Sequence, residues 1–150
     1  MSISYRAAQP SDAESILRLM RAFQVEDPWS VPFDEPEVRR SLQVLLEDPG
    51  VGSAWLICDA GRPIGYIFLC FDYSVEFGGK GAWVDEFFVQ APYRGKGIGG
   101  EALRLAEELA RQSGACALHL QVSRGNPAIH LYRRSGFQAH QRDVMTKWLR

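Results

Sequence analysis

A glycine-rich junction between an expected strand and an expected helix constrains this chain more than any other stretch. It spans residues 84–100 and reads VDEFFVQAPYRGKGIGG. The apolar run 84–89 predicts a strand, and apolar residues at helical spacing predict a helix over about 97–113. A helix start offers free N–H groups and the positive end of the helix dipole to an anion. Because glycines let a phosphate approach the backbone, and Arg94 and Lys96 add positive charge, the junction predicts a phosphate-binding site.

The glycines also have to be compared with known nucleotide-binding loops. Gly95, Gly97 and Gly100 satisfy G-x-G-x-x-G, the pattern of dinucleotide-binding domains. In such domains the first glycine follows the strand almost directly, whereas residues 90–94 intervene here. No carboxylate ends the next expected strand near Leu120, and no Gly-Lys-Ser/Thr triplet occurs. A nucleotide-binding module is therefore the weaker alternative.

The same loop matches the pattern Arg/Gln-x-x-Gly-x-Gly, as Arg94-Gly95-Lys96-Gly97-Ile98-Gly99, and a later segment carries Asn126, Tyr132 and Gly136-Phe137. With the strand before the loop, these motifs resemble the GNAT superfamily of N-acetyltransferases over essentially the whole chain. Within that superfamily, the run 85–89 followed by Tyr93-Arg94-Gly95 is similar to the diamine (spermidine/spermine-type) acetyltransferases.

The periodicity of the chain predicts one α/β domain over residues 1–150, a length that suits a single core. The expected order is βααβββαβαββ, a GNAT-like mixed and mostly antiparallel sheet flanked by helices. The last two expected strands, 137–140 and 144–149, would form a closing antiparallel pair.

The resemblance implies acetyl-CoA as co-substrate. The backbone of 87–89 would pair with the pantetheine arm, the Val89 N–H would polarise the thioester oxygen, and the loop amides would take the pyrophosphate. Asn126 stands six residues before Tyr132, one fewer than is usual in the family. The expected cofactor-binding residues are Phe87, Phe88, Val89, Arg94, Gly95, Lys96, Gly97, Ile98, Gly99, Gly100 and Asn126.

Three residues are expected to carry the chemistry. Tyr132 is the predicted general acid, since a phenol with a pKa of about 10 can donate to a thiolate that develops from a thiol of about 8.5. Asp85 and Glu86 are adjacent on a strand, and we expect their side chains to point to opposite faces. Because a carboxylate in an apolar strand is costly unless used or paired, one of them is expected to bind the amine or take its proton. No cysteine stands in the motif, which favours direct attack in a ternary complex.

An acidic loop between the first two expected helices indicates a cationic acceptor. A small amine with a second positive charge fits best, and a merely solvated loop is the alternative. The expected substrate-binding residues are Glu26, Asp27, Trp29 and Glu35.

Composition argues against several other kinds of protein and site. A formal net charge of −1 argues against non-specific nucleic-acid binding. No run of apolar residues approaches the length of a bilayer span and no signal peptide opens the chain, so no membrane association and a cytoplasmic location are expected. The three cysteines and three histidines are scattered, which predicts neither a disulfide framework nor a metal site.

Two predictions concern assembly and activity. The apolar run 144–149, together with the resemblance, predicts a homodimer. A catalytically idle GNAT-like domain that senses acyl-CoA is the alternative to an enzyme, and thiol release from acetyl-CoA separates the two.

Overall fold

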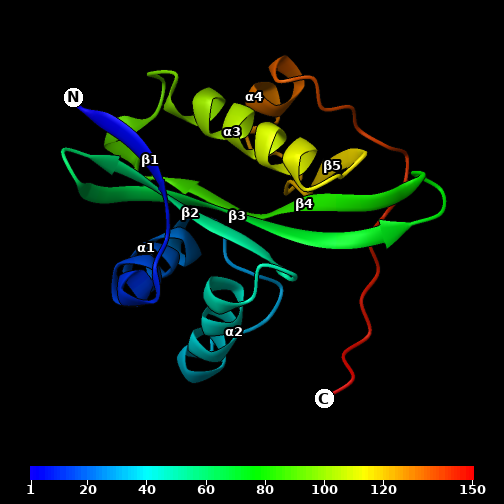
Figure 1. Ribbon diagram of the computed structural model, residues 1–150, viewed down its shortest axis with the longest axis horizontal. Coiled ribbons are helices and arrows are strands. Elements are labelled where there is room, and N and C mark those ends of the chain that lie inside the picture. Colours follow the sequence, from blue (N-terminus) through cyan, green and yellow to red (C-terminus); the bar gives the residue numbers. More distant parts are fainter.

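The computed structural model describes all residues 1–150, and one mixed sheet divides the helices into two layers (Figure 1). The strands lie in chain order, and the first four are antiparallel neighbours whereas the last runs parallel to the fourth. They are β1 (Ile3–Ala7), β2 (Gly52–Asp59), β3 (Arg62–Ser74), β4 (Gly79–Val89) and β5 (Ala117–Leu120). The predicted fold class, a mixed and mostly antiparallel sheet flanked by helices, is confirmed.

Helices cover both faces of this sheet (Figure 1). On one face lie α1 (Ala13–Glu26) and α2 (Glu35–Glu47), and on the other lie α3 (Ile98–Gln112) and the short α4 (Ile129–Arg134). Two 3-10 turns, η1 (Pro10–Asp12) and η2 (Ala91–Tyr93), precede α1 and the glycine loop. Each layer has its own apolar core, one containing Leu17 and Tyr66 and the other Ile67 and Ala102. Side chains alternate between the two faces along β3, so this one strand contributes residues to both cores.

An irregularity in β4 changes which way its acidic residues point. Phe68 of β3 faces Glu86, whereas the next residue, Leu69, faces Val84. Asp85 is therefore an extra residue, a β-bulge, and a bulge resets the alternation of side chains along the strand. Asp85 and Glu86 both line one cavity on the α1–α2 side. The prediction that they point to opposite faces was wrong, because the alternation argument holds only for a regular ladder.

The sheet splits beyond the middle of β4. The register between β4 and β5 ends at Val84, which faces Leu120, so the part of β4 after Val84 has no strand on that edge. On the β3 edge, the N–H of Gln90 donates to the carbonyl of Ile64 at 2.9 Å. Because backbone groups of successive strand residues point to alternate edges, the N–H and carbonyl of Val89 face the split. The family resemblance predicts that the pantetheine arm binds along this unpaired edge.

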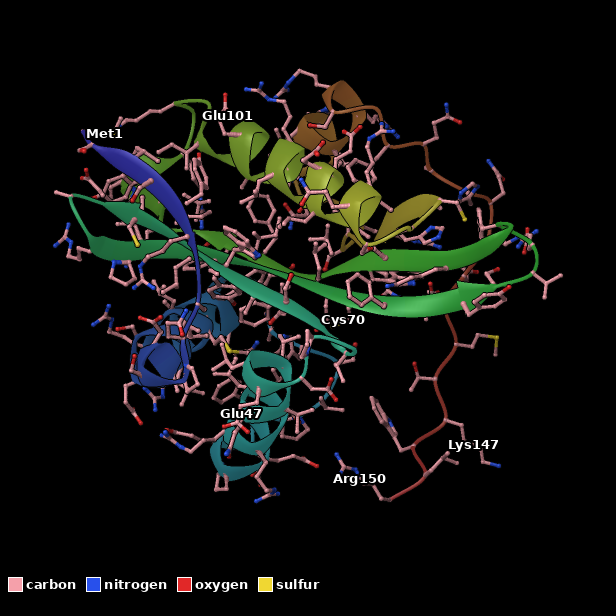
Figure 2. All side chains as sticks on the ribbon, in the orientation of Figure 1. Met1, Glu47, Cys70, Glu101, Lys147 and Arg150 are labelled. Carbon is pink, nitrogen blue, oxygen red and sulfur yellow. The ribbon has the colours of Figure 1, made fainter.

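The predicted closing strand pair was wrong. After α4 the chain has no regular structure, so the observed order is βααβββαβα rather than βααβββαβαββ. The last residues extend past the sheet toward α2, where Figure 2 shows Lys147 and Arg150. Exposed ion pairs, such as Arg142 with Glu76 and Arg150 with Glu37, hold this tail. An apolar alternating pattern forms a strand only where a neighbouring edge satisfies its backbone, and here the tail lies along none.

Candidate active site

The glycine loop presents a row of free amides at the start of α3. Gly97 is the N-cap residue with φ of 82° and no side-chain cap, and Gly95 has φ of 71°. Such positive φ angles strain any residue with a Cβ. None of the amides from Gly95 to Gly100 donates a hydrogen bond within the chain, and the first helical bond runs from the Glu101 N–H to the Gly97 carbonyl at 3.1 Å. Free amides at a helix start can bind an anion, and the phosphate site at this loop stays a prediction.

Close packing places this loop against the end of β4. A Cβ on Gly99 would lie 3.1 Å from a methyl of Leu131 on α4 and 3.5 Å from the ring of Phe87 on β4. Glycine is therefore needed here for proximity rather than for its φ angle. The loop, α4 and the unpaired edge of β4 meet at one point.

The two basic residues of the loop are held by the chain itself. The Arg94 side chain donates to the Val89 carbonyl at 2.7 Å and pairs with Glu26 of α1 at 2.5 Å. The Lys96 ammonium donates to the Pro92 carbonyl at 2.9 Å. Arg94 thus fixes the end of β4 and ties it to α1. The predicted contacts of both residues with a phosphate stay predictions.

A cavity of about 400 Å³ opens on the opposite face of the sheet from α3. Its walls come from α1, α2, β3 and β4, with Trp29 between the two helices and Val51 just before β2, and they are mostly apolar. Two carboxylates from the bulge, Asp85 and Glu86, are its only charged lining residues. The full lining consists of Met20, Trp29, Val38, Ser41, Leu42, Val44, Leu45, Val51, Phe68, Cys70, Asp85 and Glu86.

Glu86 is the most strongly perturbed carboxyl group in the cavity. Burial raises its pKa to about 7, the charges of Asp85 and Asp27 add to this rise, and a hydrogen bond from Trp29 opposes it. In that bond the Trp29 indole N–H donates to Glu86 Oε1 at 2.9 Å. Burial also raises the pKa of Asp85, whose side chain is more open to solvent. A carboxyl group that titrates near neutrality suits a general base.

Tyr132 lies on α4, at the other side of the split. Its ring is part of the core under α3 and lies 6.2 Å from that of Phe137. Burial, and then the charge of Asp27, raises the pKa of its phenol. Asn126 caps the start of this segment, because its side-chain oxygen accepts from the Ala128 N–H at 2.9 Å. The Ala128 carbonyl accepts the Tyr132 N–H at 3.1 Å, and the role of Tyr132 as general acid stays a prediction.

The acids of the loop between α1 and α2 already have partners. Glu26 pairs with Arg94, and Glu35 pairs with Arg21 and Arg39. Asp27 accepts a hydrogen bond from the Ser123 hydroxyl at 3.0 Å. Of the expected substrate-binding residues, only Trp29 lines the cavity, and the roles of the other three stay predictions.

Sequence reasoning missed most of the cavity wall. Met20, Leu42 and Phe68 recur on apolar stripes that predict core packing, and no sequence signal separates a cavity wall from a filled core. His119 on β5 packs between Phe77 and Trp83 at ring distances of 4.5 and 4.9 Å. No cluster of three or more His, Cys, Asp or Glu side chains could hold a metal ion. No helix has the length and apolar character needed to cross a bilayer.

The fold and the site together define an acyltransferase architecture, and comparison with known proteins agrees. Residues 16–137 match the acetyltransferase (GNAT) family. The chain therefore belongs to that family, as the resemblance predicted, and it is an N-acetyltransferase of the acyltransferase class.

Three similar proteins illustrate this relationship. The spermine/spermidine N(1)-acetyltransferase of Bacillus subtilis (strain 168) is 40% identical over 92% of this chain and 89% of its own. The streptothricin acetyltransferase of Streptomyces lavendulae is 30% identical over 89% and 80%, respectively. An integron cassette protein, HFX_CASS3, from the mobile metagenome of Cole Harbour Salt Marsh superposes with a TM-score of 0.84 at 32% identity, over 97% of this chain and 90% of that one. The predicted similarity to diamine acetyltransferases is confirmed.

The raised pKa of Glu86 predicts how stability depends on pH. Its pKa of about 7 in the folded state exceeds the ordinary value of 4.5, so the folded state holds the proton more tightly than the unfolded state. Stability contributed by this proton is present below pH of about 4.5 and is lost as pH rises through about 7. Glutamine cannot ionise, and we expect Glu86→Gln to gain about 2 kcal/mol over the natural chain between pH 5 and pH 8.

Urea unfolding at a series of pH values measures this difference. The exposed Glu47→Gln at the end of α2 is the matched control for exchanging a glutamate for a glutamine. Parallel stability curves for the natural chain and Glu86→Gln would show that Glu86 ionises as freely when folded as when unfolded.

Proposed function

We propose that the protein transfers the acetyl group of acetyl-CoA to a primary amine by direct attack in a ternary complex. The observation that carries this proposal is Glu86, whose pKa is about 7, on the strand whose unpaired edge lies beside the glycine loop. A base and a thioester site would then share one strand. Membership of the acetyltransferase (GNAT) family supports acetyl-CoA as the donor.

The cofactor would bind along the α3 side of the split. Its pyrophosphate would lie among the free amides of Gly95 to Gly100, and its pantetheine arm would continue the sheet beside Phe87 and Val89. The Val89 N–H would then polarise the thioester carbonyl, and an oriented amide of this kind is typically worth about 3 kcal/mol in the transition state. Arg94 supports this geometry by holding the Val89 carbonyl.

Proton transfers complete the reaction. Glu86 would take a proton from the ammonium or the attacking amine, the amine nitrogen would bond to the acetyl carbon, and the carbon–sulfur bond would break. Tyr132 would donate its phenolic proton to the departing thiolate. Cys70 lines the cavity, but burial raises its pKa to about 11, so it is a protonated thiol and a poor nucleophile. Direct attack is therefore favoured over an acyl-enzyme.

The cavity supports an acceptor with an apolar body and a second positive charge. Its walls are apolar, and Asp85 stands beside the proposed base as a second carboxylate. An aliphatic diamine satisfies both features, since its methylenes would contact the walls while its distal ammonium pairs with Asp85. The similarity to the spermine/spermidine enzyme supports this class of acceptor. Thiol release in a screen of amines tests the proposal, and binding of acetyl-CoA without release by any amine would favour a sensor.

Replacement of Gly97 tests the phosphate loop. Gly97→Glu would place a side chain and a negative charge where the pyrophosphate binds, and we expect acetyl-CoA affinity to fall by at least about 100-fold. Gly114→Glu, at the far end of α3, is the matched control because its φ of 85° imposes similar backbone strain. Calorimetry of both variants decides the matter, and equal affinities would refute the loop as the phosphate site.

Removal of the Tyr132 hydroxyl tests the general acid. If that group protonates the leaving sulfur, Tyr132→Phe should lower kcat by about 10²–10⁴-fold and leave acetyl-CoA affinity nearly unchanged. Steady-state kinetics and calorimetry on the same variant give both numbers. A kcat equal to that of the natural chain would reduce Tyr132 to a packing role.

The choice of acceptor tests the role of Asp85. For a diamine against a neutral-tailed monoamine of equal length, we expect Asp85→Asn to lower the preference in kcat/KM by about five- to tenfold, and to weaken its dependence on salt. The matched control is the double variant Asp27→Asn with Glu35→Gln, whose acids have other partners. A preference that survives in Asp85→Asn and disappears in the control would return acceptor recognition to the loop.

We also propose that the protein is a homodimer. The tail exposes Val144, Met145, Trp148 and Leu149, and the outer edge of β5 has no strand beside it. Apolar side chains and open edges of this kind are usually covered by a partner. Light scattering at micromolar concentration should give twice the chain mass, and deletion of residues 141–150 should give the monomer. A monomeric natural chain would exclude the dimer.

A further inference from the structure

Two buried polar groups near Glu86 have no hydrogen-bond partner among the groups of the protein. They are the hydroxyl of Tyr66 on β3 and the side-chain nitrogen of Gln24 in the last turn of α1. Tyr66 is fully buried, with an exposed fraction of 0%. Because a buried donor without a partner is costly, such groups in native proteins usually bond to ordered water or serve a site.

The register of the sheet places Tyr66 diagonally across from Glu86. Tyr66 faces Phe88 in the β3–β4 pair, and Phe68, two residues on, faces Glu86. The Tyr66 ring stacks on Phe68 with centroids 4.6 Å apart, so it lies on the same face as the Glu86 carboxylate. Diagonal neighbours of this kind are within reach of long side chains. The charge of Glu86 acts on Tyr66, because it adds to burial in raising the pKa of the phenol.

Trp29 links Gln24 to the same carboxylate. The backbone N–H of Trp29 donates to Gln24 Oε1 at 2.9 Å, and its indole N–H donates to Glu86 Oε1, also at 2.9 Å. Both Gln24 and Glu86 therefore have one side-chain atom fixed by Trp29. Gln24 Nε2 and Glu86 Oε2 are left for another partner.

We propose that Tyr66 and Gln24 are positioning residues that hold the Glu86 carboxylate through one ordered water. The inference rests on the proposed function, in which Glu86 is the base. The water would accept hydrogen bonds from the Tyr66 hydroxyl and Gln24 Nε2 and would donate to Glu86 Oε2. Three polar partners are what a buried water typically has. With Trp29 on Oε1 and the water on Oε2, the carboxylate would be fixed in one orientation toward the acceptor.

The arrangement would also lower the pKa of Glu86 relative to a cavity without these donors, because hydrogen bonds to the anion favour the charged form. Other charges act on Glu86 from neighbouring segments, namely Asp85 on β4 and Asp27 after α1, and from β3 the thiol of Cys70 lines the same cavity. The cavity lining from α2 contributes only the uncharged polar side chain of Ser41. None of these groups changes in the variants below, so a shift would report the hydroxyl and the amide alone.

The pH profile of kcat/KM with a diamine tests the proposal in Tyr66→Phe. We expect the acid limb to move up by about 0.5–1 pH unit, so that kcat/KM falls about three- to tenfold at pH 6 and recovers at pH 9. Tyr73→Phe, which removes an exposed hydroxyl from the same strand, should leave the limb in place. An acid limb of Tyr66→Phe that coincides with that of the natural chain would overturn the proposal.

Two further variants keep the test decisive. Gln24→Met removes the Nε2 donor without adding a charge, so it should move the acid limb in the same direction if Tyr66→Phe does not fold. Glu86→Gln separates this inference from the function on which it rests, because it should abolish the acid limb. A limb that persists in Glu86→Gln would refute Glu86 as the base, whereas a limb lost there but unmoved in Tyr66→Phe and Gln24→Met would refute the positioning residues alone.

Discussion

The extra residue in β4 is the constraint on which the arrangement of the site depends. Without the bulge at Asp85, strand alternation would place one of the two carboxylates in the apolar core under α3. Burying an unpaired carboxylate there would be costly. With it, both carboxylates enter one apolar cavity, and Phe87 and Val89 keep their places in the core beneath the glycine loop. The bulge thus turns both carboxylates toward one cavity, while the end of β5 at Leu120 leaves the edge of β4 beyond Val84 without a neighbouring strand.

Contacts between the two layers hold these parts in register. Arg94 joins the Val89 carbonyl to Glu26 at the end of α1, and Asp27 joins the loop after α1 to Ser123, beyond β5. These polar links are partly exposed, so each is expected to contribute little to global stability. Their importance lies in geometry, since they connect the proposed acceptor wall with the proposed cofactor loop across the end of the sheet.

Much of the fold followed from local sequence signals. The apolar residues at helical spacing over 97–113 and the glycine loop before them both predicted elements that the structure contains. The bulge could not be predicted, because nothing in the run 84–89 distinguishes a regular strand from an interrupted one. The prediction of a strand over 144–149 was wrong for a related reason. Alternation of apolar residues indicates a strand, but a strand also needs the edge of a neighbouring strand to pair with, and the sequence does not show whether one is present.

For the site, sequence spacing singled out the loop, Asp85, Glu86 and Tyr132 as candidates, but it did not reveal that the acids around α1 and α2 form ion pairs within the chain. Charges close in sequence suggested a cation site, whereas in space Glu35 meets two arginines and Glu26 meets one. Such pairings depend on long-range packing and carry no local signature. The cavity likewise forms between α1, α2 and the sheet, which apolar periodicity cannot reveal.

A crystal structure of the protein with coenzyme A and an aliphatic diamine is the most direct test of the account. It predicts the pyrophosphate on the amides of Gly95 to Gly100, the sulfur at the split beside Tyr132, and one amine nitrogen within hydrogen-bond distance of the Glu86 carboxylate. A diamine bound among Glu26, Asp27 and Glu35, with Glu86 facing no ligand, would contradict it.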